Sequence, residues 1–169
     1  DLDGELDLYV CNYLDYPVKA PLACFVGNSS ERLYCDPRKF HGQQDRFYHN
    51  LGPAQGWRFA DCTEKMGLAN TQGKELGVVF GDLDLDGDPD LYLANDMAPN
   101  ALYRNEGNGT HFTDVAARLG LDLVGTTRQV SWIDYDNDGD VDLFMAFRDR
   151  PNMLFRSDGG RFADVSKAV

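Results

Sequence analysis

The chain has 169 residues, of which 43% are hydrophobic, and carries 16 basic against 28 acidic side chains for a net charge of −12. This length fits one domain with its own core, and the negative charge argues against nucleic acids and anionic membrane surfaces as partners. The apolar runs are far too short for a membrane span, so we expect no membrane insertion.

The first predicted element is a short strand, LYVCN at residues 8–12, that follows the acidic stretch DLDGELD. That stretch matches the middle of two later acidic loops, so its first ligand position would lie before Asp1. We therefore expect an incomplete metal loop here. Its expected ligands are Asp1, Asp3, Asp7 and the carbonyl of Glu5.

An insertion follows at about residues 13–44, with about 28 residues more than the matching turns of the later repeats. Four cysteines allow three pairings, and Cys24 and Cys35 both lie in this insertion. We expect a Cys24–Cys35 disulfide, which would stabilise such a coreless loop by about 2–3 kcal/mol. Long loops of this kind often carry function, so the insertion is the expected binding surface.

Two further strands are predicted in DRFYHNLG (45–52) and RFADCTEKMGL (58–68). Cys62 in the second segment and Cys11 in the first strand occupy positions that hold apolar residues in the later copies. The sequence leaves open a second disulfide between Cys11 and Cys62 or two free thiols in the core.

The middle and last parts of the chain repeat one pattern. GVVFGDLDLDGDPDLYLAN is followed by NALYRNEG and HFTDVAARLGL, and the same order returns after residue 123, with glycines Gly87 and Gly139 about 50 residues apart. Four short strands per repeat are typical of a propeller blade. We expect repeat units at about 1–70, 71–122 and 123–169. The residues expected to fill the space between blades are Val78, Phe80, Leu91, Leu93, Val130, Trp132, Leu143 and Met145.

The repeated loops predict two complete metal sites. Each has carboxylates at positions 1, 3, 5 and 9 and a glycine at position 6, where the chain must bend. An oxygen-only ligand set favours a hard cation, Ca²⁺ before Mg²⁺. The expected ligands are Asp82, Asp84, Asp86, Asp90 and the carbonyl of Asp88 in one loop, and Asp134, Asp136, Asp138, Asp142 and the carbonyl of Asp140 in the other.

The sequence argues against two other assignments of these loops. An EF-hand needs a bidentate Glu at position 12 and flanking helices, whereas position 12 here is Leu93 or Met145 and the flanks have a strand pattern. Ordinary Asp-rich turns without metal would not recur at matching offsets in three copies. The repeated loop therefore indicates a metal-binding hairpin.

The repeat unit, written in the middle copy as V-x-x-x-D-x-D-x-D-G-D-x-D-L-x-x-A-N followed by N-x-L-Y-R-N-x-G-N-G-T-x-F-T-D-V, resembles the FG-GAP or VCBS repeat of integrin-α-like β-propellers. The last copy departs from it at Phe147, where the pattern has Asn. The chain looks most similar to the secreted cartilage-acidic-protein-like family, which is associated with an ASPIC/UnbV domain. The resemblance implies that the loop aspartates are Ca²⁺ ligands in a hairpin between the first two strands of a blade.

The expected fold class is therefore all-β, a β-propeller arc of about three four-stranded blades. Since natural propellers have roughly four to eight blades, we expect the chain to be part of a larger propeller, or several chains to assemble into a ring. The disulfide and the Ca²⁺ sites predict an extracellular, periplasmic or cell-surface location.

No catalytic motif stands out. His49 and His111 fall at repeat positions where structural roles suffice, and a nucleophilic or zinc site at His41 would need partners that the sequence does not supply. We therefore expect a non-enzymatic, calcium-stabilised scaffold that binds a protein or glycan ligand, with structural calcium. The alternative is a non-catalytic propeller portion of a secreted enzyme acting on carbohydrates or phosphoesters.

Overall fold

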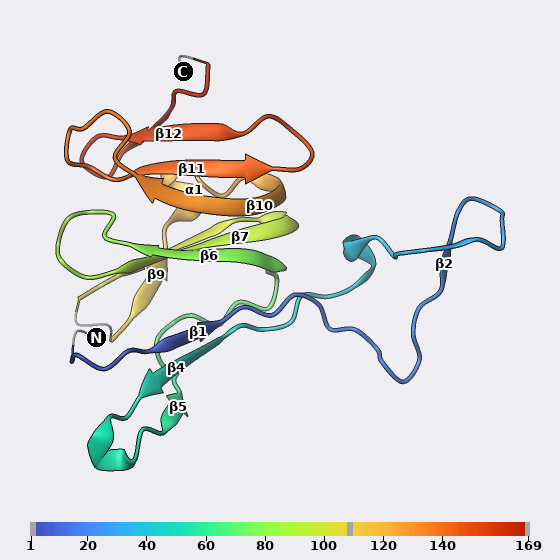
Figure 1. The fold of residues 1–169 in the computed structure, drawn as a ribbon, viewed down its shortest axis with the longest axis horizontal. Coiled ribbons are helices and arrows are strands. Elements are labelled where there is room, and N and C mark those ends of the chain that lie inside the picture. Colours follow the sequence, from blue (N-terminus) through green and yellow to red (C-terminus); the bar gives the residue numbers. More distant parts are fainter. Residues whose placement is uncertain (1–2, 108–109, 168–169) are drawn as a thin grey trace.

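The computed structural model describes residues 3–107 and 110–167. The chain folds mainly into antiparallel strands, which confirms the all-β prediction. Successive sheets lie against one another, and a long arm leaves the first of them (Figure 1). Within the described residues no helix is long and apolar enough to cross a membrane.

The first sheet has three strands in the order β1-β4-β5. The arm leaves between β1 and β4 and contains a two-stranded hairpin and a short 3-10 turn. The bounds are β1 (Leu8–Val10), β4 (Arg46–Asn50), β5 (Phe59–Asp61), β2 (Cys24–Phe25), β3 (Arg32–Leu33), η1 (Pro37–Lys39) and, between β4 and β5, η2 (Pro53–Gln55).

Two four-stranded meanders follow, in which each strand pairs with the next along the chain. The second sheet consists of β6 (Glu75–Gly81), β7 (Asp90–Pro99), β8 (Ala101–Asn105) and β9 (Phe112–Asp114), and the short helix α1 (Ala116–Leu119) follows it. The third consists of β10 (Val124–Ile133), β11 (Asp142–Phe147), β12 (Met153–Ser157) and β13 (Phe162–Asp164). The end of β7 also pairs with the start of β10 and joins the two meanders into one curled sheet, an arrangement that fits a partial propeller.

The same kind of hydrogen bond closes three equivalent connections: β1 to β4, β7 to β8, and β11 to β12. In each, a backbone N–H within or just after the earlier strand donates to a side-chain oxygen just before the later strand. The Asn95 N–H donates to Asn100 Oδ1 at 2.8 Å, and the Phe147 N–H donates to Asn152 Oδ1 at 3.1 Å. In the first sheet the Asn12 N–H donates to Asp45 Oδ1 at 2.6 Å, across the base of the arm. The arm therefore interrupts the turn without removing the bond that closes it.

The core lies between the sheets, in two clusters. Leu91 and Leu93 of β7 pack toward the first sheet against Tyr9 and Phe47. The alternate β7 side chains pack toward the third sheet, with members including Tyr92, Ala94, Leu143 and Met145. Strand β7 is buried on both faces because side chains alternate between the faces of a strand.

Two of the residues expected between blades are exposed. Val78 and Phe80 of β6 retain 38% and 48% of their accessible surface, whereas Val130, at the matching position of β10, retains 6%. Val130 belongs to the core cluster between the second and third sheets, whereas Val78 and Phe80 belong to neither core cluster. The prediction was therefore wrong for Val78 and Phe80.

The cysteines divide into one bonded pair and two thiols. Cys24 and Cys35 form a disulfide with their Cα atoms 5.3 Å apart. Cys11 and Cys62 are free and pack beside the first cluster, so the possible second pair does not form. They follow β1 and β5, which lie on opposite sides of β4, and two strand spacings of about 4.8 Å exceed the reach of a disulfide.

Candidate functional site

The acidic loops connect β6 to β7 and β10 to β11, and they have nearly the same backbone. Gly87 and Gly139 have φ values of 93° and 95°, in the left-handed region that glycine adopts without steric cost. Leu85 and Asn137 have φ values of 59° and 60°, a conformation that a leucine rarely adopts. Figure 1 shows both loops at one end of the molecule, opposite the arm.

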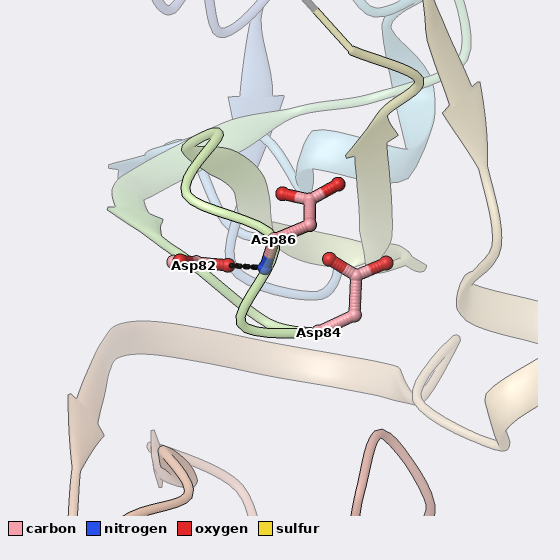
Figure 2. Close-up of side chains that lie close together, drawn as sticks. All are labelled: Asp82, Asp84 and Asp86. Carbon is pink, nitrogen blue, oxygen red and sulfur yellow. Dashed lines mark hydrogen bonds between the residues drawn. The ribbon is translucent and has the colours of Figure 1, made fainter.

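Each loop brings three carboxylates together. In the first, oxygen atoms of Asp82, Asp84 and Asp86 lie within 4.8 Å of one another (Figure 2). Asp82 also fixes the bend, since its carboxylate accepts hydrogen bonds from the N–H groups of Asp86 and Gly87 at 3.1 and 2.9 Å.

The second loop repeats this arrangement. Asp134, Asp136 and Asp138 form the corresponding group, and Asp134 accepts a hydrogen bond from the Gly139 N–H at 3.3 Å. The chemistry available to both groups is the binding of a hard cation by oxygen ligands.

In each group, the surroundings disfavour the ionised form of the central carboxylate, so its pKa is raised. Loss of hydration raises the pKa of Asp84, and the neighbouring carboxylates of Asp86 and Asp82 raise it further. Loss of hydration likewise raises the pKa of Asp136, together with the negative charge of Asp138. A bound cation would remove this repulsion, and the residues present therefore fit a divalent metal.

The position-nine aspartates are placed differently from the other three. Asp90 and Asp142 are buried and accept hydrogen bonds from backbone N–H groups, at 2.8 Å from Asn105 and 2.8 Å from Ser157. Burial raises the pKa of Asp90 to about 6. These side chains tie the loop to the third strand of each meander and lie outside the three-carboxylate groups, so their role as ligands stays a prediction.

The carbonyls of Asp88 and Asp140 follow the bend glycines, as expected, and their role as ligands also stays a prediction. The Asp140 side chain has a separate contact, because its Oδ2 accepts a hydrogen bond from the Gly159 N–H at 2.7 Å. This contact connects the acidic loop to the β12–β13 turn.

The first loop keeps part of the pattern. Gly4 has a φ of 90°, Asp3 Oδ1 accepts a hydrogen bond from the Glu5 N–H at 2.8 Å, and Asp7 Oδ1 accepts one from the Asn50 N–H at 2.8 Å. Asp1 lies outside the described residues. Among those that are described, this loop assembles no group of three carboxylates.

Sequence reasoning missed a pair of buried carboxyl groups between the first two sheets. Asp45 is fully buried and accepts a hydrogen bond from the Tyr9 hydroxyl at 2.8 Å. Burial, followed by the negative charge of Asp45, raises the pKa of Glu75 to about 8. Burial also raises the pKa of the nearby Cys11 thiol to about 12, so this thiol is a poor nucleophile.

Sequence reasoning also missed a pocket between the arm and the sheet ends, with a volume of about 940 Å³. Its arm side includes Tyr16, Phe40 and the Cys24–Cys35 disulfide, and its sheet side includes Asp96 and Arg128. The sequence predicts that the insertion is a binding surface, but its composition does not indicate which sheet residues it contacts.

The comparisons with known proteins agree with this geometry. Residues 82–145, which span both acidic loops, match the FG-GAP-like repeat family. This part of the chain is therefore similar to an FG-GAP-like repeat.

Three relatives with similar sequences are named cartilage acidic protein 1. Identity is 34% over 97 residues for the Xenopus tropicalis protein, 35% over 80 residues for the mouse protein and 31% over 96 residues for the human protein. These alignments cover 57%, 47% and 56% of this chain but only 15%, 12% and 14% of the relatives. The resemblance to the cartilage-acidic-protein-like family is thus confirmed, and the chain matches a small part of those proteins' length.

Proposed function

We propose that the chain is a calcium-stabilised portion of an extracellular β-propeller that acts as a binding scaffold, with about three blades and no catalytic role for the metal. The observation that carries this proposal is the pair of equivalent acidic hairpins on successive meanders. Two loops with matching dihedral angles and matching carboxylate groups are expected when each holds the same kind of ion.

Calcium would be held by Asp82, Asp84 and Asp86 in one loop and by Asp134, Asp136 and Asp138 in the other. When bound, it neutralises the clustered carboxylates and cross-links each loop. The protein's own contribution is to hold the loops open at this spacing, through the position-nine aspartates and the left-handed glycines.

The extracellular assignment is supported by three features of the chain. The arm is closed by a disulfide, which persists in oxidising compartments. Acidic loops of this type suit extracellular calcium concentrations. The matched relatives carry the name cartilage acidic protein.

Thermal unfolding with calcium or excess EGTA tests the metal assignment. Binding at a hundred times the dissociation constant adds about 2.7 kcal/mol per site. That corresponds to a melting-temperature increase on the order of 5 to 10 °C per site in a chain of this size. We expect D84N to remove about half of the calcium-dependent shift and D84N/D136N to remove nearly all of it.

Asp122 provides a matched control, because it is an exposed aspartate outside both loops. D122N should respond to calcium like the unmodified chain. Equal melting temperatures in calcium and in EGTA would refute the metal assignment, as would a calcium response in D84N/D136N equal to that of the unmodified chain.

A further inference from the structure

One structurally equivalent residue from each of the three repeats lines the pocket beside the arm. Tyr13, Asp96 and Arg148 each follow the residue whose N–H makes the turn-closing hydrogen bond. All three line the same pocket. These three positions are structurally equivalent, yet they hold an aromatic, an acidic and a basic side chain. Packing alone does not require this difference.

Irregular backbone directs further side chains toward this pocket. The register of β10 against β11 shifts between Thr127 and Gln129, which leaves Arg128 at a bulge, and Met97 at the end of β7 has a φ of 58°. Bulges often re-aim side chains at functional sites. Arg128 and Met97 both line the pocket.

One oxygen of a carboxylate that lines the pocket lacks a hydrogen bond within the described part of the chain. Asp96 is 3% exposed, and its Oδ2 accepts a hydrogen bond from the Tyr13 hydroxyl. Its Oδ1 is buried and has no partner among the described residues. Because an unpaired buried carboxylate oxygen is costly, this atom calls for a hydrogen-bond donor from outside the chain.

The rim supplies positive charge and aromatic surface. Arg128 and Arg148 are exposed, and neither is in a salt bridge within the described part of the chain, although the protein carries a net charge of −12. Tyr34 is 98% exposed and Tyr16 45% exposed at the arm side. Such aromatic faces suit the C–H surfaces of a sugar ring, and guanidinium groups suit a carboxylate.

We propose that this pocket binds an acidic saccharide, whose hydroxyl group donates a hydrogen bond to Asp96 and whose carboxylate lies against Arg128 and Arg148. This rests on the proposed function as a binding scaffold and names its ligand class. A simple anion would be repelled by Asp96, and a neutral sugar would leave both arginines unpaired. A sugar that carries both hydroxyl groups and a carboxylate satisfies the two requirements together.

Calorimetric titration of the chain in millimolar calcium tests this proposal. The probes are a hyaluronan tetrasaccharide, which contains glucuronate, and tetra-N-acetylchitotetraose, a neutral oligosaccharide of the same length. We expect the acidic probe to bind at least about tenfold more tightly than the neutral one, since a hydrogen bond to a charged group contributes that much or more. The R128Q/R148Q variant should lose this preference.

R118Q is the matched control, because Arg118 is an exposed arginine on α1, outside the pocket. It should bind both probes like the unmodified chain. D96N should weaken both probes by at least about tenfold with an unchanged melting temperature. The arginine variants change exposed side chains only, so they test the charge preference independently of D96N.

Three results would overturn the proposal: no binding of the acidic probe, equal binding of the two probes, or unchanged affinity in R128Q/R148Q. The outcome is separable from the metal assignment. Calcium-dependent melting without saccharide binding would refute only the ligand class, and saccharide binding without a calcium effect on melting would refute only the metal sites.

Discussion

Glu75 is a carboxyl group that the fold keeps protonated near neutral pH. It is 4% exposed, its Oε1 accepts a hydrogen bond from the Asn70 side chain at 3.0 Å, and its Oε2 is buried without a partner in the described chain. Ionisation would place a second negative charge beside Asp45 in the core. The proton therefore stays on Glu75 to a higher pH than in the unfolded chain.

This predicts a stability that falls as the pH rises. The pKa of Glu75 increases from 4.5 to about 8 on folding, so its favourable contribution is complete below pH 4.5 and is lost as the pH rises through about 8. Replacing Glu75 with Gln should remove that part of the slope and stabilise the protein above pH 8. Urea unfolding at several pH values between 5 and 9 in calcium measures this.

Glu64→Gln is the control for Glu75→Gln, because Glu64 is an exposed glutamate. Its pH profile should match that of the unmodified protein. Identical slopes for Glu75→Gln and the unmodified chain would show that Glu75 is not the group responsible. Asp90, whose pKa burial raises to about 6, remains in both proteins and so cancels from the comparison.

At the residue scale, the sequence supports a prediction where a position repeats, although the role of the loop aspartates as metal ligands stays a prediction. The spacing of Asp82, Asp84 and Asp86 was sufficient to expect a carboxylate group, because loop geometry follows from local sequence. Asp96 and Arg148 could not be found in this way. They lie far apart in the chain and differ from each other, and only the packing of successive sheets brings equivalent turns to one pocket.

At the scale of elements, the arm depends on its disulfide more than on its secondary structure. The β2–β3 hairpin pairs only two residues on each strand, and most of its side chains are exposed. The two cysteines of the Cys24–Cys35 bridge have a sequence separation of 11. For a loop of this length, the chain-entropy estimate of the stabilisation is about 3 kcal/mol. The sequence could predict the bridge, but not that the hairpin would extend away from the sheets.

We expect Cys24→Ala/Cys35→Ala to loosen the arm alone. Limited proteolysis should then cleave within residues 20–35 at least about tenfold faster, because the bridge no longer restricts local opening. The melting temperature of the sheets should change little. Cys62→Ser, which removes a free thiol, is the control, and equal cleavage rates in the two proteins would mean that the arm is ordered without its disulfide.

At the scale of the whole molecule, the contacts between successive sheets bury equivalent side chains to different extents. The contact between the second and third sheets buries Val130, whereas the corresponding Val78 remains 38% exposed beside the smaller first sheet. The sequence alone made these valines equivalent, since each precedes an acidic loop by four residues. Their burial differs because it is decided by the neighbouring sheet and not by the strand itself.

The pair offers a direct measurement of inter-sheet packing. Val130→Ala should lower the free energy of unfolding by about 1–3 kcal/mol, because it leaves a cavity in a closed interface. Val78→Ala should change it by less than about 0.5 kcal/mol. Chemical denaturation in calcium measures both, and equal losses would contradict the placement of the two side chains.

The hydrogen bond from the Asn12 N–H to Asp45 has a consequence for how this protein can change. This bond holds the two ends of the arm together in the same way that the equivalent bonds hold the ends of the short turns in the second and third sheets. The arm is therefore a replaceable part, attached at a junction that the sheet maintains for its own stability. Exchange of residues 13–44 for the short turn of the second sheet should leave the β1–β4 register intact, so that recognition can evolve on the arm independently of the fold that carries it.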